Sequence, residues 1–265
     1  MDALDGFDTE VQHLIAELQG LDVYNFGWGS ITTFTPWIFI TPIIMFLVIW
    51  YFKNNVTYLP KRNFVAILEI IVEYLKKEIG DNLLGHHARE HMPFLLTAFF
   101  FIVGANLLGL VPGGKSATGT ISVTAAVALC SFGYFNYAGA KHYGLWTYIK
   151  HIAPAGMPPV VNVMVWVIEA FSMTLRIATL SIRLFINMFA GHLVMGCFAL
   201  LASMFARPMV EHFSLRTLVT AGVPALGWVM MLMIVVALEL FVAFIQAYIF
   251  TLLSGVYIML ATSEH

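Results

Sequence analysis

The stretch "SIRLFINMFAGH", from Ser181 to His192, places an arginine inside apolar sequence. Large apolar residues surround Arg183 on both sides along the chain, as they would in a membrane-spanning segment. A cation at the centre of a bilayer costs about 2.5–3.5 kcal/mol on insertion scales. The stretch therefore predicts a membrane helix in which Arg183 has a function that offsets this cost.

The composition points to the same class of protein. Of 265 residues, 60% are hydrophobic and 11% are charged, and the mean hydropathy is +0.85. A soluble domain is about 45–50% apolar and about 25% charged. We therefore expect a polytopic membrane protein. No basic cluster suggests a nucleic-acid partner, and the isolated Cys130 and Cys197 predict two packed thiols and neither a disulfide nor a metal site.

Five apolar stretches are long enough to cross a bilayer, which takes about 20 residues. They cover about residues 34–52, 93–112, 121–140, 160–205 and 218–261. The last two have about 45 residues each and would be near 65 Å long as unbroken helices, about twice the hydrocarbon thickness. They must break or be strongly tilted, and neither has a proline deep in its interior.

Two further segments lie outside these spans. Residues 1–33 form an acidic N-terminal segment, whose first 22 residues hold no Lys or Arg and so predict no signal peptide. Residues 62–84 place apolar and charged side chains on different sectors of a helix. This pattern indicates an amphipathic helix at the membrane surface, and the alternative is a cytosolic helix packed on a partner.

The basic residues predict the orientation in the membrane. If the N-terminus is outside, the inner loops hold eight Lys and Arg residues and the outer side holds three. The inner residues are Lys53, Lys61, Arg62, Lys76, Lys77, Arg89, Lys141 and Lys150, and the outer ones are Lys115, Arg207 and Arg216. This asymmetry favours an outer N-terminus and an inner C-terminus.

Polar residues form a stripe along the fourth stretch, centred on Arg183. At about 100° per residue, Glu169 and Arg176 project within about 40° of Arg183. The stripe consists of Glu169, Ser172, Arg176, Thr179, Arg183 and Asn187. His192 lies half a turn away, and the fifth stretch carries Glu239 and Gln246 on one face. Two long helices with polar stripes predict a wet path between them.

Other interpretations of these residues remain open. Arg183 and Glu239 would then form a buried ion pair, Asn187 and Gln246 would bond across helices, and Arg176 would reach the inner surface. The spacing of His86, His87 and His91 resembles a metal site, but a solvated loop is the better explanation. "GLVPGGKS", Gly109 to Ser116, fits a phosphate-loop pattern that requires a preceding strand, and here an apolar span precedes it.

The motifs resemble subunit a of the F-type rotary ATP synthase. "SIRLFINMFAGH" is similar to the arginine motif of that family, and Gln246 to Phe250 resembles its Gln-Ala-x-Ile/Val-Phe motif. "ANLLGLVPG" followed by "TGTISVTAAVAL" resembles the membrane hairpin before them. Ile182 and Ile186 depart from the usual Leu and small residue. The acid and histidine that the family places at two facing positions occur here in the order His192, then Glu239.

The resemblance implies an all-α polytopic membrane protein. It would have about five membrane helices and a surface helix, the last two helices being long and strongly tilted. Residues 1–33 would be an outer segment, and residues 34–265 a single membrane domain. The chain would be a proton-conducting stator subunit, not catalytic by itself and without cofactor or metal. Its partners would be the c-subunit ring, b-type peripheral stalk subunits, the remainder of the complex and the lipid bilayer.

The resemblance also implies roles for the polar residues. Protons would reach the ring through an outer half-channel containing His192, Glu239, Asn187 and Gln246. An inner half-channel would contain Glu169 and Ser172, with Arg176 on the same stripe. Arg183 would separate the two. The expected location is a bacterial plasma membrane, with the mitochondrial inner membrane as the alternative. The competing hypothesis is a proton-coupled secondary transporter, although the repeated halves of such folds are not visible in the sequence.

Overall fold

The computed structural model describes residues 12, 15, 23–26, 29–32, 35–55, 63–111, 114–144, 148, 159–211 and 218–262. Five helical segments in these ranges are long and apolar enough to cross a membrane, which confirms the expected number of spans. The helices are α2 (Thr35–Asn55), α3 (Asn63–Leu75), η1 (Lys76–Leu84), η2 (Gly85–His87), α4 (Ala88–Leu110), η3 (Ala117–Gly119), α5 (Ile121–Tyr143), α7 (Pro159–Glu211), η4 (Leu218–Gly222) and α9 (Val223–Thr262). The all-α membrane fold is confirmed.

A short β-hairpin precedes the membrane helices and was not predicted. Strands β1 (Val23–Phe26) and β2 (Gly29–Thr32) pair antiparallel, with Val23 opposite Thr32 and Phe26 opposite Gly29. The six acidic residues that characterise the N-terminal segment lie outside the described residues. The hairpin is therefore an addition to the helical fold. It lies within residues 1–33, for which the sequence predicted only an acidic character.

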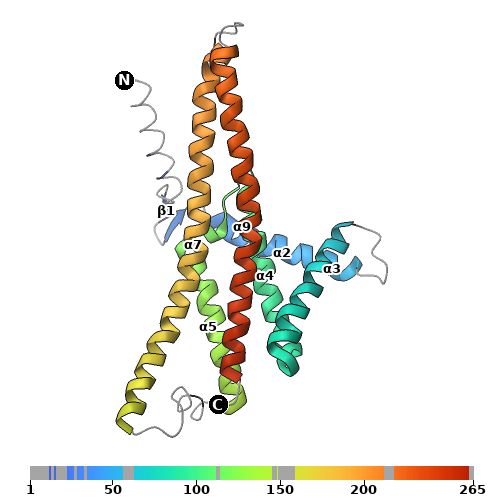
Figure 1. The fold of residues 1–265 in the computed structure, drawn as a ribbon, viewed down its shortest axis with the longest axis vertical. Helices are drawn as coiled ribbons and strands as arrows, with labels where there is room; N and C mark the ends of the chain where they lie inside the picture. The colour runs from blue at the N-terminus through green and yellow to red at the C-terminus, as the bar shows by residue number, and fades with distance from the viewer. Residues whose placement is uncertain are drawn as a thin grey trace.

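The two long helices, α7 and α9, pack side by side and are continuous (Figure 1). Their 53 and 40 residues correspond to lengths of about 80 and 60 Å. Helix α2, with 21 residues, is about 30 Å long and matches the hydrocarbon thickness. Figure 1 shows α2 running crosswise to the direction of the long pair. If α2 stands upright in the bilayer, α7 and α9 must be strongly tilted, and neither breaks.

The predicted surface helix extends as expected over residues 63–84, but its second half is a π-helix. This half docks on α9, because a side chain added at Gly255 would lie 2.9 Å from the Ile79 Cγ2 atom. Ile79 is fully buried as a result. The chain then reverses at Gly85, whose φ of +53° favours glycine, and α4 begins. The surface helix is thus tied to the bundle at its C-terminal end.

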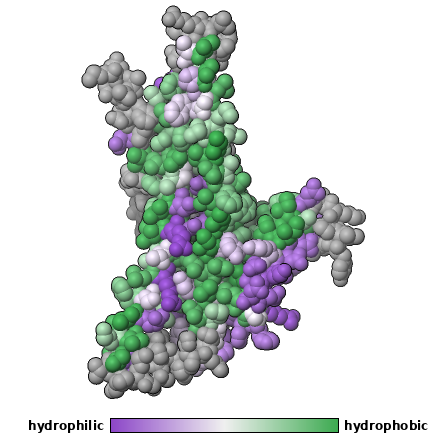
Figure 2. All heavy atoms as spheres, in the orientation of Figure 1, coloured by the Kyte–Doolittle hydropathy of each residue, from purple (hydrophilic) through white to green (hydrophobic). Residues whose placement is uncertain are grey.

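The core lies where α4, α5 and α9 meet. Leu95, Ile102 and Ile258 are completely buried there. Hydroxyl pairs join α5 to the long helices: Ser131 to Ser254 of α9 at 2.8 Å, and Thr124 to Ser181 of α7 at 3.2 Å. Such small polar residues let membrane helices approach closely and bond across the interface. On the face that Figure 2 shows, apolar side chains cover most of the long helices, as expected for a surface in contact with lipid.

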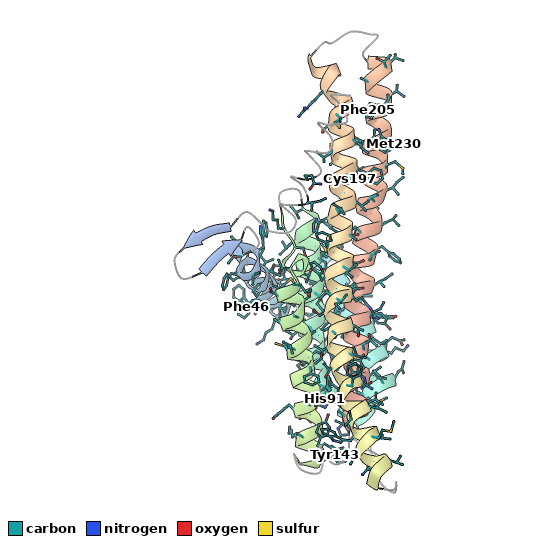
Figure 3. All side chains as sticks on the ribbon, turned by 90° about the vertical axis from the view of Figure 1, so that its left-hand side faces the viewer. Phe46, His91, Tyr143, Cys197, Phe205 and Met230 are labelled. Carbon is teal, nitrogen blue, oxygen red and sulfur yellow. The ribbon has the colours of Figure 1, made fainter. Side chains whose placement is uncertain are left out.

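Two local predictions are partly wrong. His86 and His87 are exposed in a short turn, as a solvated loop requires. His91 is only 5% exposed, and its Nδ1 atom lies 3.1 Å from the Tyr134 hydroxyl, near the end of the bundle that also holds Tyr143 (Figure 3). Helix α4 begins at Ala88, five residues before the predicted span, and this earlier start places His91 in the bundle. Cys130 is exposed and Cys197 is partly buried, so the packed-thiol prediction fails for Cys130.

The phosphate-loop pattern has the surroundings of a membrane loop. Helix α4 runs through Gly109 to Leu110, where the pattern requires a strand. The Ser116 side chain is fully buried and donates a hydrogen bond of 2.9 Å to the Ala105 carbonyl. The hydroxyl that a phosphate loop would offer to a metal ion is therefore already used inside the bundle.

Candidate functional site

Arg183 lies on the open face of α7. Its side chain is exposed, and so are its neighbours Ile182 and Ile186, at 46% and 55%. Within the described part of the chain, neither of the two ion pairs includes Arg183. Figure 2 shows a broken line of hydrophilic residues along the otherwise apolar long helices. The arginine is thus a cation presented from an apolar surface, available to a charge outside this chain.

Glu169 and Arg176 form an ion pair at the N-terminal end of the polar stripe, before Arg183. An Arg176 guanidinium nitrogen lies 3.1 Å from Glu169 Oε1, and both side chains are partly buried. The guanidinium also lies over the Tyr257 ring of α9, 5.2 Å from its centroid. Ser172, between the paired residues in sequence, is half-buried. Arg176 is therefore held by two partners and does not simply extend to the inner surface.

Tyr148 adds a further polar group near this pair. Its hydroxyl donates a hydrogen bond of 3.1 Å to Asn136 Oδ1, and its ring packs on Gly139 of α5. Burial raises the pKa of the Tyr148 hydroxyl, and the positive charge of Arg176 opposes this rise. At the end of α7 that carries Glu169, the Glu169, Arg176 and Tyr148 side chains therefore have partners, whereas the buried Asn162 Oδ1 atom has none among the described residues.

Glu239 and His192 lie further along the same helix pair, and the carboxyl and imidazole groups each lie close to a glycine. Gly191 faces the Glu239 carboxyl group so closely that any side chain at position 191 would overlap it. His192, the next residue, points toward α4, where a side chain added at Gly109 would lie 2.9 Å from its Nε2 atom. Two glycines thus give the carboxyl and imidazole groups room between α4, α7 and α9.

Polar atoms around Glu239 and His192 are buried without hydrogen-bond partners among the described residues. They are Glu239 Oε1, His192 Nε2 and Asn187 Nδ2. Leaving a buried polar group unsatisfied costs about 1–3 kcal/mol. Gln246 lies seven residues after Glu239 on the same face of α9 and is only 7% exposed. The region around Glu239 therefore concentrates groups that can bind water or a proton.

Neither structural alternative for these residues accounts for their positions. Arg183 and Glu239 form no ion pair in the described part of the chain, and Glu239 is buried while Arg183 is exposed. The Asn187 amide nitrogen makes no hydrogen bond to Gln246 or to any other described residue. The polar groups of the two long helices are thus not paired with one another as structural links.

Known proteins share this arrangement of motifs. The family described as ATP synthase A chain matches residues 34–259, which include all of α7, α9 as far as residue 259, and all eight polar residues of the candidate site. The chain belongs to the ATP synthase subunit a family.

Relatives in this family cover most of the chain. The ATP synthase subunit a of Myxococcus xanthus is 34% identical over 234 residues, which are 86% of this chain and 72% of the relative. That of Chloroherpeton thalassium is 30% identical over 98% of this chain and 75% of the relative. That of Anaeromyxobacter dehalogenans strain 2CP-1 is 37% identical over 77% of this chain and 50% of the relative. The chain is a multi-pass membrane protein of this family.

One polar cluster, which lies between α4 and η3, was not predicted from the sequence. Thr118 donates a hydrogen bond of 2.6 Å to Asn106 Oδ1, and the Thr118 and Ser116 hydroxyls are 2.7 Å apart. All three side chains are buried, and Asn106 Nδ2 has no partner among the described residues. A side chain added at Gly109 would meet both Ser116 and His192, so the cluster lies beside His192. The available signal was a run of small hydroxyl residues directly after an apolar span.

The described residues contain no group of three or more His, Cys, Asp or Glu side chains arranged to hold a metal ion. The polar residues of the site instead carry amide, hydroxyl, imidazole, carboxyl and guanidinium groups. Such groups can transfer protons or organise water.

Proposed function

We propose that this chain is the proton-conducting stator subunit of an F-type ATP synthase in a bacterial plasma membrane. The observation that carries the proposal is Arg183, an exposed cation without an ion-pair partner among the described residues, on an apolar membrane helix. An intramembrane charge normally faces a cavity or a partner and not lipid. The partner would be the membrane carboxyl group of a c subunit in the rotating ring.

Arg183 acts by charge and by position. A guanidinium remains protonated at any physiological pH. It stabilises the ionised form of an approaching carboxylic acid, so the acid releases its proton. The same positive charge opposes a hydronium ion that would cross directly between the half-channels. Each proton therefore travels around with the ring, and ring rotation is coupled to proton flow.

The outer half-channel delivers protons through the region around Glu239. Glu239, His192, Asn187 and Gln246 relay protons or organise water there. The unpartnered polar atoms support this role, because water is the natural partner for buried polar groups in a membrane protein. The Asn106, Thr118 and Ser116 cluster extends the polar surface toward the loop between α4 and α5.

The inner half-channel receives protons near Glu169 and Ser172. Arg176 neutralises Glu169 and fixes its direction, and Tyr257 holds Arg176 against α9. The chain itself performs no catalysis, and ATP is made in a separate soluble head that ring rotation drives. Peripheral stalk subunits of the b type hold this chain stationary. Residues 34–265 act as one membrane domain, and residues 1–33 lie outside.

The test of the proposal is the Arg183→Ala variant in inverted membrane vesicles. We expect ATP-driven proton pumping to be lost while the chain still inserts, as measured by the amount of assembled complex. Arg183→Lys should also be badly impaired, since a point charge does not replace the spread-out donors of a guanidinium. The control is Ser203→Ala, at an exposed position of α7 outside the polar stripe, where the hydroxyl donates a hydrogen bond of 2.7 Å to the Leu200 carbonyl of its own helix; this variant should pump normally. Normal pumping by Arg183→Ala would refute the mechanism.

The orientation can be tested separately with an impermeant thiol reagent on intact cells. Single cysteines replace Asp8 and Ser263 in a background without Cys130 and Cys197. With the N-terminus outside, the reagent should label position 8 and leave position 263 unlabelled until the cells are opened. The reverse pattern would invert the topology and exchange the two half-channels.

A further inference from the structure

An apolar groove separates the first half of the surface helix from the bundle. It has a volume of about 330 Å³. Ile70 and Tyr74 of α3 form one wall, Ile245 and Tyr248 of α9 form the other, and Phe99 of α4 lies at the bottom. The Tyr74 and Tyr248 rings approach across the groove to 6.0 Å between centroids. The groove ends where η1 docks on α9, so it is a gap between two elements that are joined further along.

The groove opens to the surroundings of the membrane domain. Ile70 and Tyr74 are 65% and 52% exposed, and Ile245 on the opposite wall is 38% exposed. Phe241, one turn before Ile245, is 64% exposed, so the apolar surface continues outward from the rim. In a chain that crosses a bilayer, such a continuous apolar surface is covered by hydrocarbon. The rim tyrosines are typical of the level where the bilayer meets water.

The size of the groove selects among possible occupants. A helix is about 10 Å wide with its side chains, so it would rest on the rim of the groove and would not fill it. Water is a poor occupant, because a stable water needs two or more polar partners and the lining is apolar. An unbranched, flexible hydrocarbon chain matches both the width and the chemistry.

We propose that the groove binds one acyl chain of a bilayer phospholipid. The chain fills the space between α3 and α9 and connects the two walls by apolar contact. The lipid then fills the space between α3, residues 63–75, and α9. The next turns, η1, need no lipid because they pack directly on α9. This binding site does not depend on the proton pathway, since its lining contains none of the residues assigned to either half-channel.

The proposal can be tested by photolabelling the intact complex in phosphatidylcholine vesicles. A small fraction of the lipid carries a diazirine in the middle of one acyl chain. After irradiation, mass spectrometry locates the labelled peptides. We expect label on both walls, in the peptides around Ile70 and around Ile245. Ile70→Trp should fill the groove and reduce labelling of the opposite wall, around Ile245, by about threefold or more.

The matched control is Ile67→Trp, which adds the same indole ring to a 55% exposed residue outside the groove lining. It should leave labelling around Ile245 unchanged. Both substitutions are at exposed positions, and the yield of assembled complex checks that folding is preserved. Equal labelling around Ile245 in both variants and the unmodified chain would overturn the proposal. Absence of label from both walls of the unmodified chain would overturn it as well, because the groove would then be closed to lipid.

Discussion

The two polar regions of the α7–α9 pair differ in whether their ionisable groups have partners among the described residues. Near the Glu169 end, Arg176 pairs with a carboxylate and stacks on Tyr257, and Tyr148 bonds to Asn136. Around Glu239, three polar atoms are buried and make no hydrogen bonds among the described residues, namely Glu239 Oε1, His192 Nε2 and Asn187 Nδ2. Satisfied groups stabilise a fixed arrangement, whereas unsatisfied ones destabilise the fold and so indicate another use. The region around Glu239 is the better candidate for groups that exchange protons.

After the Arg183 variants, we expect the largest loss of proton flux from a substitution at Gly191, which lies against the Glu239 carboxyl group. Gly191→Ala places a methyl group where the Glu239 carboxyl lies, so the carboxyl must move. A displacement that raises the barrier to proton transfer by about 1.4 kcal/mol slows it about tenfold. We expect at least this loss in proton flux through vesicles at a fixed membrane potential, with the complex still assembled.

The control for this change is Gly227→Ala on α9. A methyl group at Gly227 meets no atom within 4 Å among the described residues, so flux should remain near that of the unmodified chain. If Gly191→Ala conducts as well as Gly227→Ala, the Glu239 carboxyl is not required at its observed position.

An exchange of the acid and the imidazole should have a smaller effect than either single change. His192→Glu or Glu239→His alone leaves two like groups at these positions, and each should slow proton uptake. The double variant keeps one acid and one imidazole in reverse order, an order that the resemblance to the family also allows. We expect its flux to exceed that of both single variants. A double variant no better than the worse single one would show that the residues do not act as a pair.

Much of this architecture could be predicted from local sequence. The spans follow from the length of apolar stretches, and the surface helix follows from the spacing of residues such as Ile67 and Ile71. The polar stripe follows from helical geometry, so Glu169 and Arg176 were expected on one face. Their ion pair at 3.1 Å agrees with that geometry.

Contacts between distant elements could not be predicted in this way. Nothing local to Tyr257 indicates that its ring lies against Arg176, since the two residues belong to different helices. His91 was assigned to a solvated loop because its neighbours are polar, but its side chain packs against Tyr134 of α5. The π-helical turns of η1 lie where the chain docks against α9, and no propensity in "KKEIGDNLL" predicts them. These features are set by packing and not by the local pattern.

The smallest effect is expected at the partnered end, where Tyr257 holds Arg176. Tyr257→Leu removes the aromatic face, and a cation over such a face contributes about 0.5–2 kcal/mol. We expect a modest fall in the thermal stability of the solubilised complex and little change in proton flux. Tyr257→Phe keeps the face and removes only the hydroxyl, so it should retain both properties. Static light scattering on heating and flux at fixed potential measure the two. A large loss of flux with unchanged stability in Tyr257→Leu would contradict the contrast drawn between the two regions, because the partnered end would then control proton movement as strongly as the region around Glu239.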